Sequence, residues 1–121
     1  MAKNKIITDA ELLFNKAIKD YKNENYIASY HSFFSIAGYP NSKSNDAKFW
    51  LAKHLEFGYG TSKNEKKVFE YYSQVYDDSK SVYREQARNR LMYCYYYGIG
   101  TNKDERQAVD ERIQDEQEIT W

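Results

Sequence analysis

The chain has 121 residues, of which 41% are hydrophobic and 30% are charged. This length predicts one domain with enough apolar side chains for a core, and no stretch approaches the ~20 apolar residues of a membrane-spanning helix. The 18 basic and 18 acidic residues cancel, which argues against nucleic acid as the partner because nucleic-acid-binding proteins usually carry a basic excess.

The N-terminal segment and the single cysteine predict the compartment. The segment MAKNKIITDAELL has two lysines but lacks the continuous apolar region of a secretory signal. Cys94 is the only cysteine, so it has no disulfide partner within its own chain. We therefore expect a protein of the reducing cytoplasm that does not associate with membranes.

Apolar residues of the first third recur with the helical period and predict two helices. The first spans 9–22 and begins with the capping box Thr8-x-x-Glu11. The second spans 25–37 and ends at a turn that contains Pro40, the only proline. The side chains expected to face inward are Leu13, Phe14, Ala17, Ile18 and Tyr21 in the first helix, and Tyr26, Ile27, Tyr30, Phe33, Phe34 and Ala37 in the second.

Four more helices are predicted over 45–57, 64–76, 79–97 and 103–117. Short connections between helices of similar length predict antiparallel hairpins, which gives three hairpins at 9–37, 45–76 and 79–117. The helix at 103–117 is mostly charged and is expected to be a polar terminal cap. The inward side chains are expected to be Ala47, Leu51 and Leu55, then Val68, Tyr71, Tyr72 and Val75, then Val82, Tyr83, Ala87, Leu91, Cys94 and Tyr95.

An internal repeat with a period of 40 residues runs through the two later hairpins. Ala47-x-x-x-Leu51 and the segment GYGTSK at 58–63 return as Ala87-x-x-x-Leu91 and GIGTNK at 98–103. A fixed period of this size predicts stacked copies of one supersecondary unit. The first glycine of each pair is expected to end a helix in the left-handed conformation, and the second to allow a tight turn. Asn64 and Asp104 are expected to cap the helices that follow.

The segments AKFWLAKHLEFGYGTSKNEKKVFEYYSQVY at 47–76 and ARNRLMYCYYYGIGTNKDERQAVDER at 87–112 resemble Sel-one-like repeats, which are related to tetratricopeptide repeats. The resemblance implies an all-α fold over 1–121, a short right-handed α/α superhelix of three antiparallel helix hairpins. The second copy departs from the pattern with Met92 after the leucine and Glu111-Arg112 in place of an aromatic pair. The family also implies a role as an adaptor or scaffold that binds proteins or peptides.

Six side chains are the candidate partner-binding residues. In tetratricopeptide-like folds the first helix of each hairpin lines the concave face, and its packing positions leave one stripe of the helix available. That stripe consists of Trp50, Lys53 and Phe57 on one helix and Arg90, Tyr93 and Tyr97 on its repeat. Tryptophan, tyrosine and arginine dominate protein-binding hot spots. The alternative is that Trp50 and Phe57 pack against the first hairpin and Tyr97 against the last helix.

Signals of catalytic or metal chemistry are weak. The Gly-x-Gly segments lack the third glycine and the preceding strand of a dinucleotide-binding loop. His31, His54 and Cys94 lie in different hairpins without the spacing of a metal site. We expect Cys94 to be a buried structural thiol and His54 to lie at the edge of a helix packing seam. No catalytic residue, cofactor or metal is predicted.

The sequence therefore predicts a non-enzymatic protein–protein interaction module. One concrete version is a bacterial immunity protein that neutralises a toxin by covering it. A second hypothesis is a self-assembling structural unit, monomer or homodimer, which pairs through the first helix or through 119–121. A third is a small hydrolase that uses Cys94 or a histidine, although no polar cluster indicates one.

Overall fold

The computed structural model describes residues 8–109, and within this range the chain forms helices joined by turns, with no strand. The helices are α1 (Asp9–Lys22), α2 (Tyr26–Ala37), α3 (Ser44–Phe57), α4 (Glu65–Asp77) and α5 (Arg84–Tyr97). A further helical segment begins at Glu105 and reaches the last described residue, Val109. The predicted all-α class is confirmed for this range. Most of the predicted cap at 103–117, and the proposed pairing segment at 119–121, lie outside the described residues.

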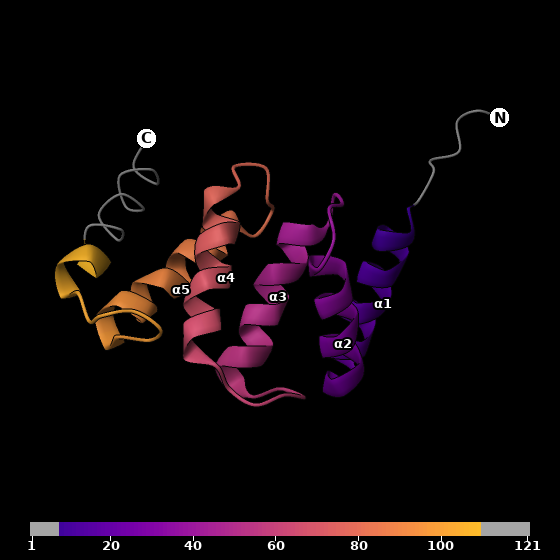
Figure 1. Cartoon of the computed structure of the whole chain (residues 1–121), viewed down its shortest axis with the longest axis horizontal. Coiled ribbons are helices and arrows are strands. Elements are labelled where there is room, and N and C mark those ends of the chain that lie inside the picture. Colours follow the sequence, from indigo (N-terminus) through magenta and orange to yellow (C-terminus); the bar gives the residue numbers. More distant parts are fainter. Residues whose placement is uncertain (1–7, 110–121) are drawn as a thin grey trace.

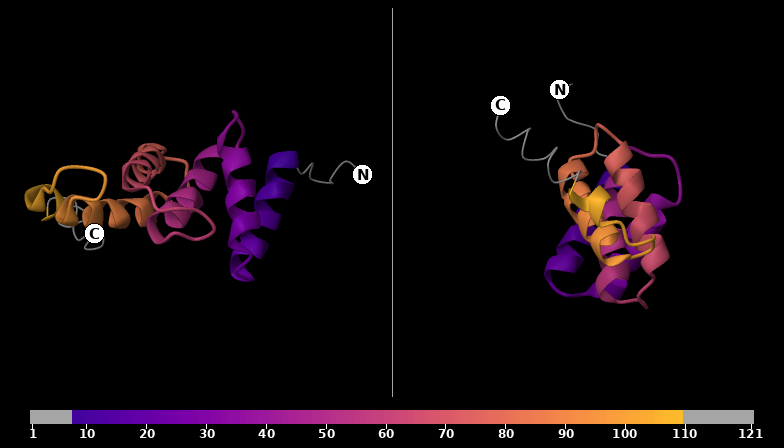
Figure 2. Two further views of the ribbon diagram at one scale, coloured as in Figure 1. Left: turned by 60° about the horizontal axis from the view of Figure 1, so that its bottom comes forward. Right: turned by 90° about the vertical axis from the view of Figure 1, so that its left-hand side faces the viewer.

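The helices form an elongated row in chain order (Figure 1). The main contacts join α1 to α2, α2 to α3, α3 to α4 and α4 to α5. In the left view of Figure 2, α5 lies across the direction of α1 and α2, so the helix direction turns along the row. This arrangement places α3 at the centre, between the first hairpin and the later helices.

Side-chain caps fix the helix starts where the sequence predicted them. The Thr8 hydroxyl accepts a hydrogen bond from the Glu11 amide at 3.1 Å, and the Glu11 carboxylate accepts one from the Thr8 amide at 2.9 Å. The side-chain oxygen Oδ1 of Asn64 accepts from the Lys67 amide at 3.1 Å. Asp104 does the same for the Gln107 amide at 3.0 Å. These bonds satisfy amides that the first helical turn leaves without a partner.

The repeated Gly-x-Gly segments make equivalent tertiary contacts. Gly58 and Gly98 end α3 and α5 in the left-handed conformation, with φ of 73° and 71°. The second glycine of each pair approaches the first residue of the helix one earlier in the chain than the helix that the pair ends. The approach is so close that a Cβ would not fit. A Cβ at Gly60 would lie 2.5 Å from the carbonyl carbon of Tyr26 in α2, and one at Gly100 would lie 2.1 Å from the carbonyl oxygen of Glu65 in α4. The sequence repeat is therefore also a repeat of packing.

The core consists of two adjoining clusters that share α3. Leu51 on one side of α3 packs with α1 and α2, and Leu55 on another side packs with α4 and α5. Trp50, Tyr30, Tyr71 and Tyr83 contact both clusters. The buried members are Phe14, Ala17, Phe33, Ile36, Ala47 and Leu51 in one cluster, and Phe49, Ala52, Leu55, Val68, Tyr72, Val75, Ala87, Leu91 and Cys94 in the other.

Three side chains that were predicted to face inward are exposed, and the predicted start of α5 is wrong. Helix α5 begins at Arg84 rather than Ser79, and Val82 is 78% exposed. In α2, Ile27 and Phe34 are 66% and 56% exposed, while Ile36 is fully buried. The buried stripe of α2 is Ser29, Phe33 and Ile36. Because the apolar face of α2 is wide and its buried stripe includes a serine, its hydrophobic pattern did not identify the buried face.

The buried Cys94 thiol is expected to be unreactive in the folded protein. Burial, with a contribution from the Glu56 charge, raises the pKa of Cys94 to about 12. The thiolate is the reactive form, so it is scarce at neutral pH. We expect Ellman's reagent to label less than a tenth of the protein in buffer and the whole of it in guanidinium chloride. Rapid labelling of the native protein would contradict this burial.

Candidate interaction surface

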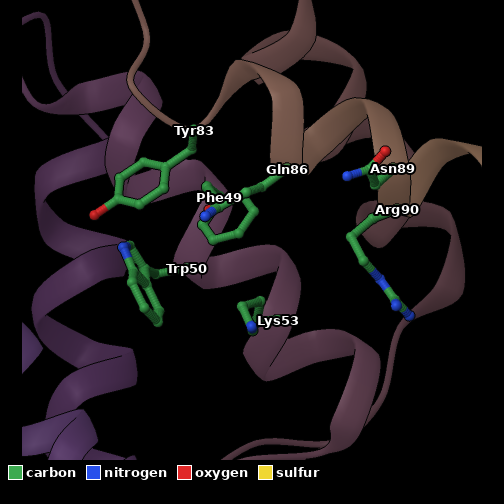
Figure 3. A pocket seen from close by; sticks show the side chains of 7 residues that line it. All are labelled: Phe49, Trp50, Lys53, Tyr83, Gln86, Asn89 and Arg90. Atoms are coloured by element: carbon green, nitrogen blue, oxygen red, sulfur yellow. The ribbon is translucent and has the colours of Figure 1, made fainter. Parts of the chain in front are cut away.

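An open groove of about 370 Å³ lies between α3 and the start of α5 (Figure 3). Its volume falls at the lower end of the range of about 300–1,000 Å³ that is usual for ligand sites. Helix α3 contributes Phe49, Trp50 and Lys53, and the α5 segment contributes Tyr83, Gln86, Asn89 and Arg90. Phe49 and Lys53 on α3 are four positions apart, and so are Gln86 and Arg90 on α5, so each pair shares one face of its helix.

Aromatic rings line one end of the groove and are held by packing. Phe49 stacks on Tyr83 with ring centroids 4.7 Å apart and planes 3° from parallel. Trp50 lies at 83° to Tyr83 at 5.7 Å and also contacts Tyr21 of α1 at 4.9 Å and Phe33 of α2 at 5.9 Å. Trp50 thus packs against the first hairpin, as the alternative interpretation expected. Its indole N–H points toward Tyr83 in Figure 3, is buried, and has no hydrogen-bond partner within residues 8–109.

Lys53 places an ammonium group beside these rings. Its Nζ lies 5.6 Å from the Phe49 ring centroid and 5.7 Å from that of Trp50. A cation over an aromatic face is attracted by the negative face of the ring. In the described part of the chain no carboxylate forms an ion pair with Lys53. Its charge is therefore available to a partner.

Arg90 faces the groove and also forms an ion pair within the fold. Its guanidinium forms an ion pair with Glu56, whose other carboxylate oxygen accepts a hydrogen bond from the Tyr72 hydroxyl at 2.8 Å. Burial alone would lower the pKa of Arg90, but the hydrogen bond and charge of Glu56 raise it above its usual value. Burial and the same carboxylate raise the pKa of Tyr72. Arg90 therefore stays charged, with part of that charge compensated inside the protein.

Arg90 also connects the groove to an exposed aromatic cluster. Its guanidinium carbon lies 4.4 Å from the Tyr93 ring centroid and 5.7 Å from that of Phe57. Tyr93 stacks on Tyr97 at 6.1 Å, with planes 17° apart. Phe57, Tyr93 and Tyr97 are 43%, 48% and 63% exposed. We call the groove lining together with these three residues the α3–α5 surface.

The six candidate residues thus lie on one connected surface, in two environments. Trp50, Lys53 and Arg90 line the groove, while Phe57, Tyr93 and Tyr97 lie outside its lining. Sequence reasoning missed the groove residues Phe49, Tyr83, Gln86 and Asn89. The repeat could have indicated part of this lining, because Asn89 lies 40 residues after Phe49, just as Arg90 lies 40 residues after Trp50.

His54 is fully buried, so its predicted place at the edge of a seam is wrong. Its Nδ1 lies 2.7 Å from the Trp50 carbonyl oxygen, which only accepts, so Nδ1 carries the proton. Its Nε2 accepts from the Ser29 hydroxyl at 2.7 Å. The spacing resembles that of a nucleophile and its base, but both side chains have no exposed surface. A substrate cannot reach Ser29 there, and the pair joins α2 to α3.

Acidification is expected to destabilise the protein through His54. Burial lowers its pKa, although the hydrogen bond to Trp50 opposes this shift. Between that lowered pKa and the unfolded value near 6.5, the unfolded chain binds more protons than the folded one, so the free energy of unfolding falls as pH decreases through this window. Urea unfolding at several pH values should show that the free energy of unfolding falls more steeply with decreasing pH for the wild type than for His54→Gln. Equal pH dependence of the two proteins would show that His54 does not cause the loss.

No group of three or more His, Cys, Asp or Glu side chains in residues 8–109 is arranged to hold a metal ion. Within the same range no helix has both the length and the apolar character needed to cross a membrane. No protein-family model matches the chain, and a search of curated proteins finds no match.

Proposed function

We propose that this protein is a non-enzymatic protein–protein interaction module of the cytoplasm, an adaptor or scaffold that binds a partner protein or peptide through the α3–α5 surface. The observation that carries the proposal is the connected set of aromatic and cationic side chains between Trp50 and Tyr97. Aromatic and arginine side chains supply most of the energy in protein interfaces. Association would remove the exposed faces of Phe57, Tyr93 and Tyr97 from water.

The proposal includes the finer architecture, a short right-handed superhelix of Sel-one-like hairpins. It is supported by the equivalent contacts of Gly60 with α2 and Gly100 with α4 and by the turning of the helix row. Repeat folds of this kind present extended surfaces that suit protein partners. A toxin neutralised by an immunity protein is one partner that such a surface could cover.

Self-assembly is the second candidate, because α2 also leaves apolar side chains exposed. Ile27 and Phe34 are separated by two helical turns and lie on the outer side of the first hairpin. A second copy could cover them and form a homodimer. Light scattering after size-exclusion chromatography at two concentrations separates this candidate from a monomeric adaptor.

The test of the adaptor function compares two triple variants in partner capture. Lys53→Ala, Tyr93→Ala and Tyr97→Ala together remove one half-buried cation and two exposed rings of the α3–α5 surface. The matched control replaces Tyr39, Lys66 and Val109, which are exposed elsewhere and belong to neither candidate surface. Trp50 and Arg90 are left unchanged because both also hold the fold together. Lysate of the source cells is passed over each tagged protein, and the retained proteins are identified by mass spectrometry.

We expect the wild type and the control to retain the same partner and the α3–α5 variant to lose it. Circular dichroism and thermal unfolding should show that all three proteins are folded. Retention of the partner by the α3–α5 variant, or the absence of any partner on the wild type, would overturn the proposal.

A further inference from the structure

The polar groups of the groove are cationic or neutral. Its seven lining residues include two cations, Lys53 and Arg90, and no carboxylate. The carboxylate beside it, Glu56, is 8% exposed and already binds Arg90 and Tyr72. The groove is therefore positive in a chain whose formal net charge is zero.

The two cations differ in what they can offer. Arg90 shares its charge with Glu56, whereas Lys53 has no ion-pair partner in the described residues. The aromatic rings beneath Lys53 attract a cation but leave its outer side open to a second, negative group. A carboxylate beside Lys53 would gain a charge-assisted hydrogen bond without breaking one in the protein.

The remaining lining adds neutral polar groups and an apolar face. Gln86 and Asn89 are exposed on α5, and within residues 8–109 their side chains make no hydrogen bond. Each amide can both donate and accept, which suits the backbone of an extended peptide. The half-buried ring of Tyr83, which stacks on the buried Phe49, lies beside them and provides contact area for an apolar side chain.

We propose that the groove binds an acidic peptide segment of the partner, with one carboxylate against Lys53 and an adjacent aromatic side chain against Tyr83. The inference rests on the proposed function and specifies the chemistry of the partner. Charge complementarity selects it, because a basic segment would place like charges beside Lys53 and Arg90.

The experiment uses three fluorescent peptides and two charge-reversal variants of the full chain. The first peptide has a central tryptophan flanked by acidic residues, the second has lysines in place of the acids, and the third has alanine in place of the tryptophan. Fluorescence anisotropy measures their binding to the wild type, to Lys53→Glu, and to Lys66→Glu, which makes the same change of charge at an exposed site on α4. The indole N–H signal of Trp50 in NMR spectra, assigned with a Trp121→Phe variant, reports whether the groove is occupied.

We expect the acidic tryptophan peptide to bind the wild type most tightly. Its affinity should fall about tenfold with Lys53→Glu and fall further in high salt. Lys66→Glu should bind like the wild type, and the Trp50 signal should shift on binding. Three results would each overturn the inference. The lysine peptide could bind as tightly as the acidic peptide, the two variants could weaken binding equally, or light scattering could show a dimer whose formation shifts the Trp50 signal. The capture experiment is then repeated with Lys53→Ala alone and with Tyr93→Ala and Tyr97→Ala together. If the captured partner needs Tyr93 and Tyr97 but not Lys53, the inference fails while the proposed function stands.

Discussion

Replacing Gly60 with alanine is expected to lower the free energy of unfolding by about 3 kcal/mol. The left-handed conformation of Gly60, with φ of 70°, costs an L-residue about 1–2 kcal/mol. The new Cβ would also lie 2.5 Å from the Tyr26 carbonyl carbon and 2.7 Å from the Ile27 amide nitrogen. These are backbone atoms of α2, so relief requires the loop and the helix to move apart. Denaturant unfolding monitored by circular dichroism measures the change.

Gly58→Ala is the matched control, because Gly58 has nearly the same φ but more room. A Cβ there would meet the Lys63 side chain at 3.4 Å, and we expect a loss of about 1 kcal/mol. The second copy provides an independent pair, since Gly100 is closer to backbone than Gly98 in the same way. Equal losses for Gly58→Ala and Gly60→Ala would show that conformation alone, and not contact with α2, requires the second glycine.

The contact at Gly60 also helps to position the proposed binding surface. Tyr59, between the two glycines, stacks on Tyr26 of α2 with ring centroids 4.5 Å apart. This loop follows α3 directly, so the angle between α2 and α3 depends on it. Because Trp50 and Lys53 lie on α3, we expect a Gly60 variant that remains folded to bind a partner more weakly.

Local signals in the sequence predicted the all-α class and most of the helix ends. The Thr8 and Asn64 caps, the glycine stops and the buried stripe of α3 each depend on residues within one or two helical turns. The start of α5 depends on distant partners instead. The Asp78 carboxylate accepts from the Asn45 amide at 2.9 Å, and the Ser81 hydroxyl donates to Asp46 at 2.7 Å. These bonds to α3 hold the preceding turns out of the helix, and a periodic pattern does not reveal them.

The site was predictable only as far as the repeat extended. The 40-residue spacing placed Trp50 and Arg90 at equivalent positions of α3 and α5, and both line the groove. It could not show that Trp50 packs on Tyr21, or that His54 bonds Ser29 across 25 positions of sequence. Both contacts join the first hairpin, which lacks the glycine pair, to the repeated part of the chain.

Replacing Arg90 with alanine is expected to destabilise the protein by about 2 kcal/mol. Its side chain is 30% exposed and that of Glu56 only 8%, so the variant would leave a largely buried carboxylate without its cation. Loss of one partner of a fully buried pair costs about 3–5 kcal/mol, and the partial exposure of Arg90 reduces this figure. The change is measured by urea unfolding at neutral pH.

Lys67→Ala is the control, because Lys67 pairs with Glu70 at 3.3 Å where both side chains are well exposed, at 50% and 38%. We expect a loss below about 0.5 kcal/mol there. Glu56→Gln keeps an acceptor for Tyr72 but removes the charge, so the cost of Arg90→Ala should shrink in that background. An undiminished cost would mean that Arg90 contributes by packing on Tyr93 and Phe57 instead. In either case, the stability of an Arg90 variant must be measured before its loss of partner binding can be attributed to a lost contact with the partner. For this reason Lys53, Tyr93 and Tyr97 are the residues to change first.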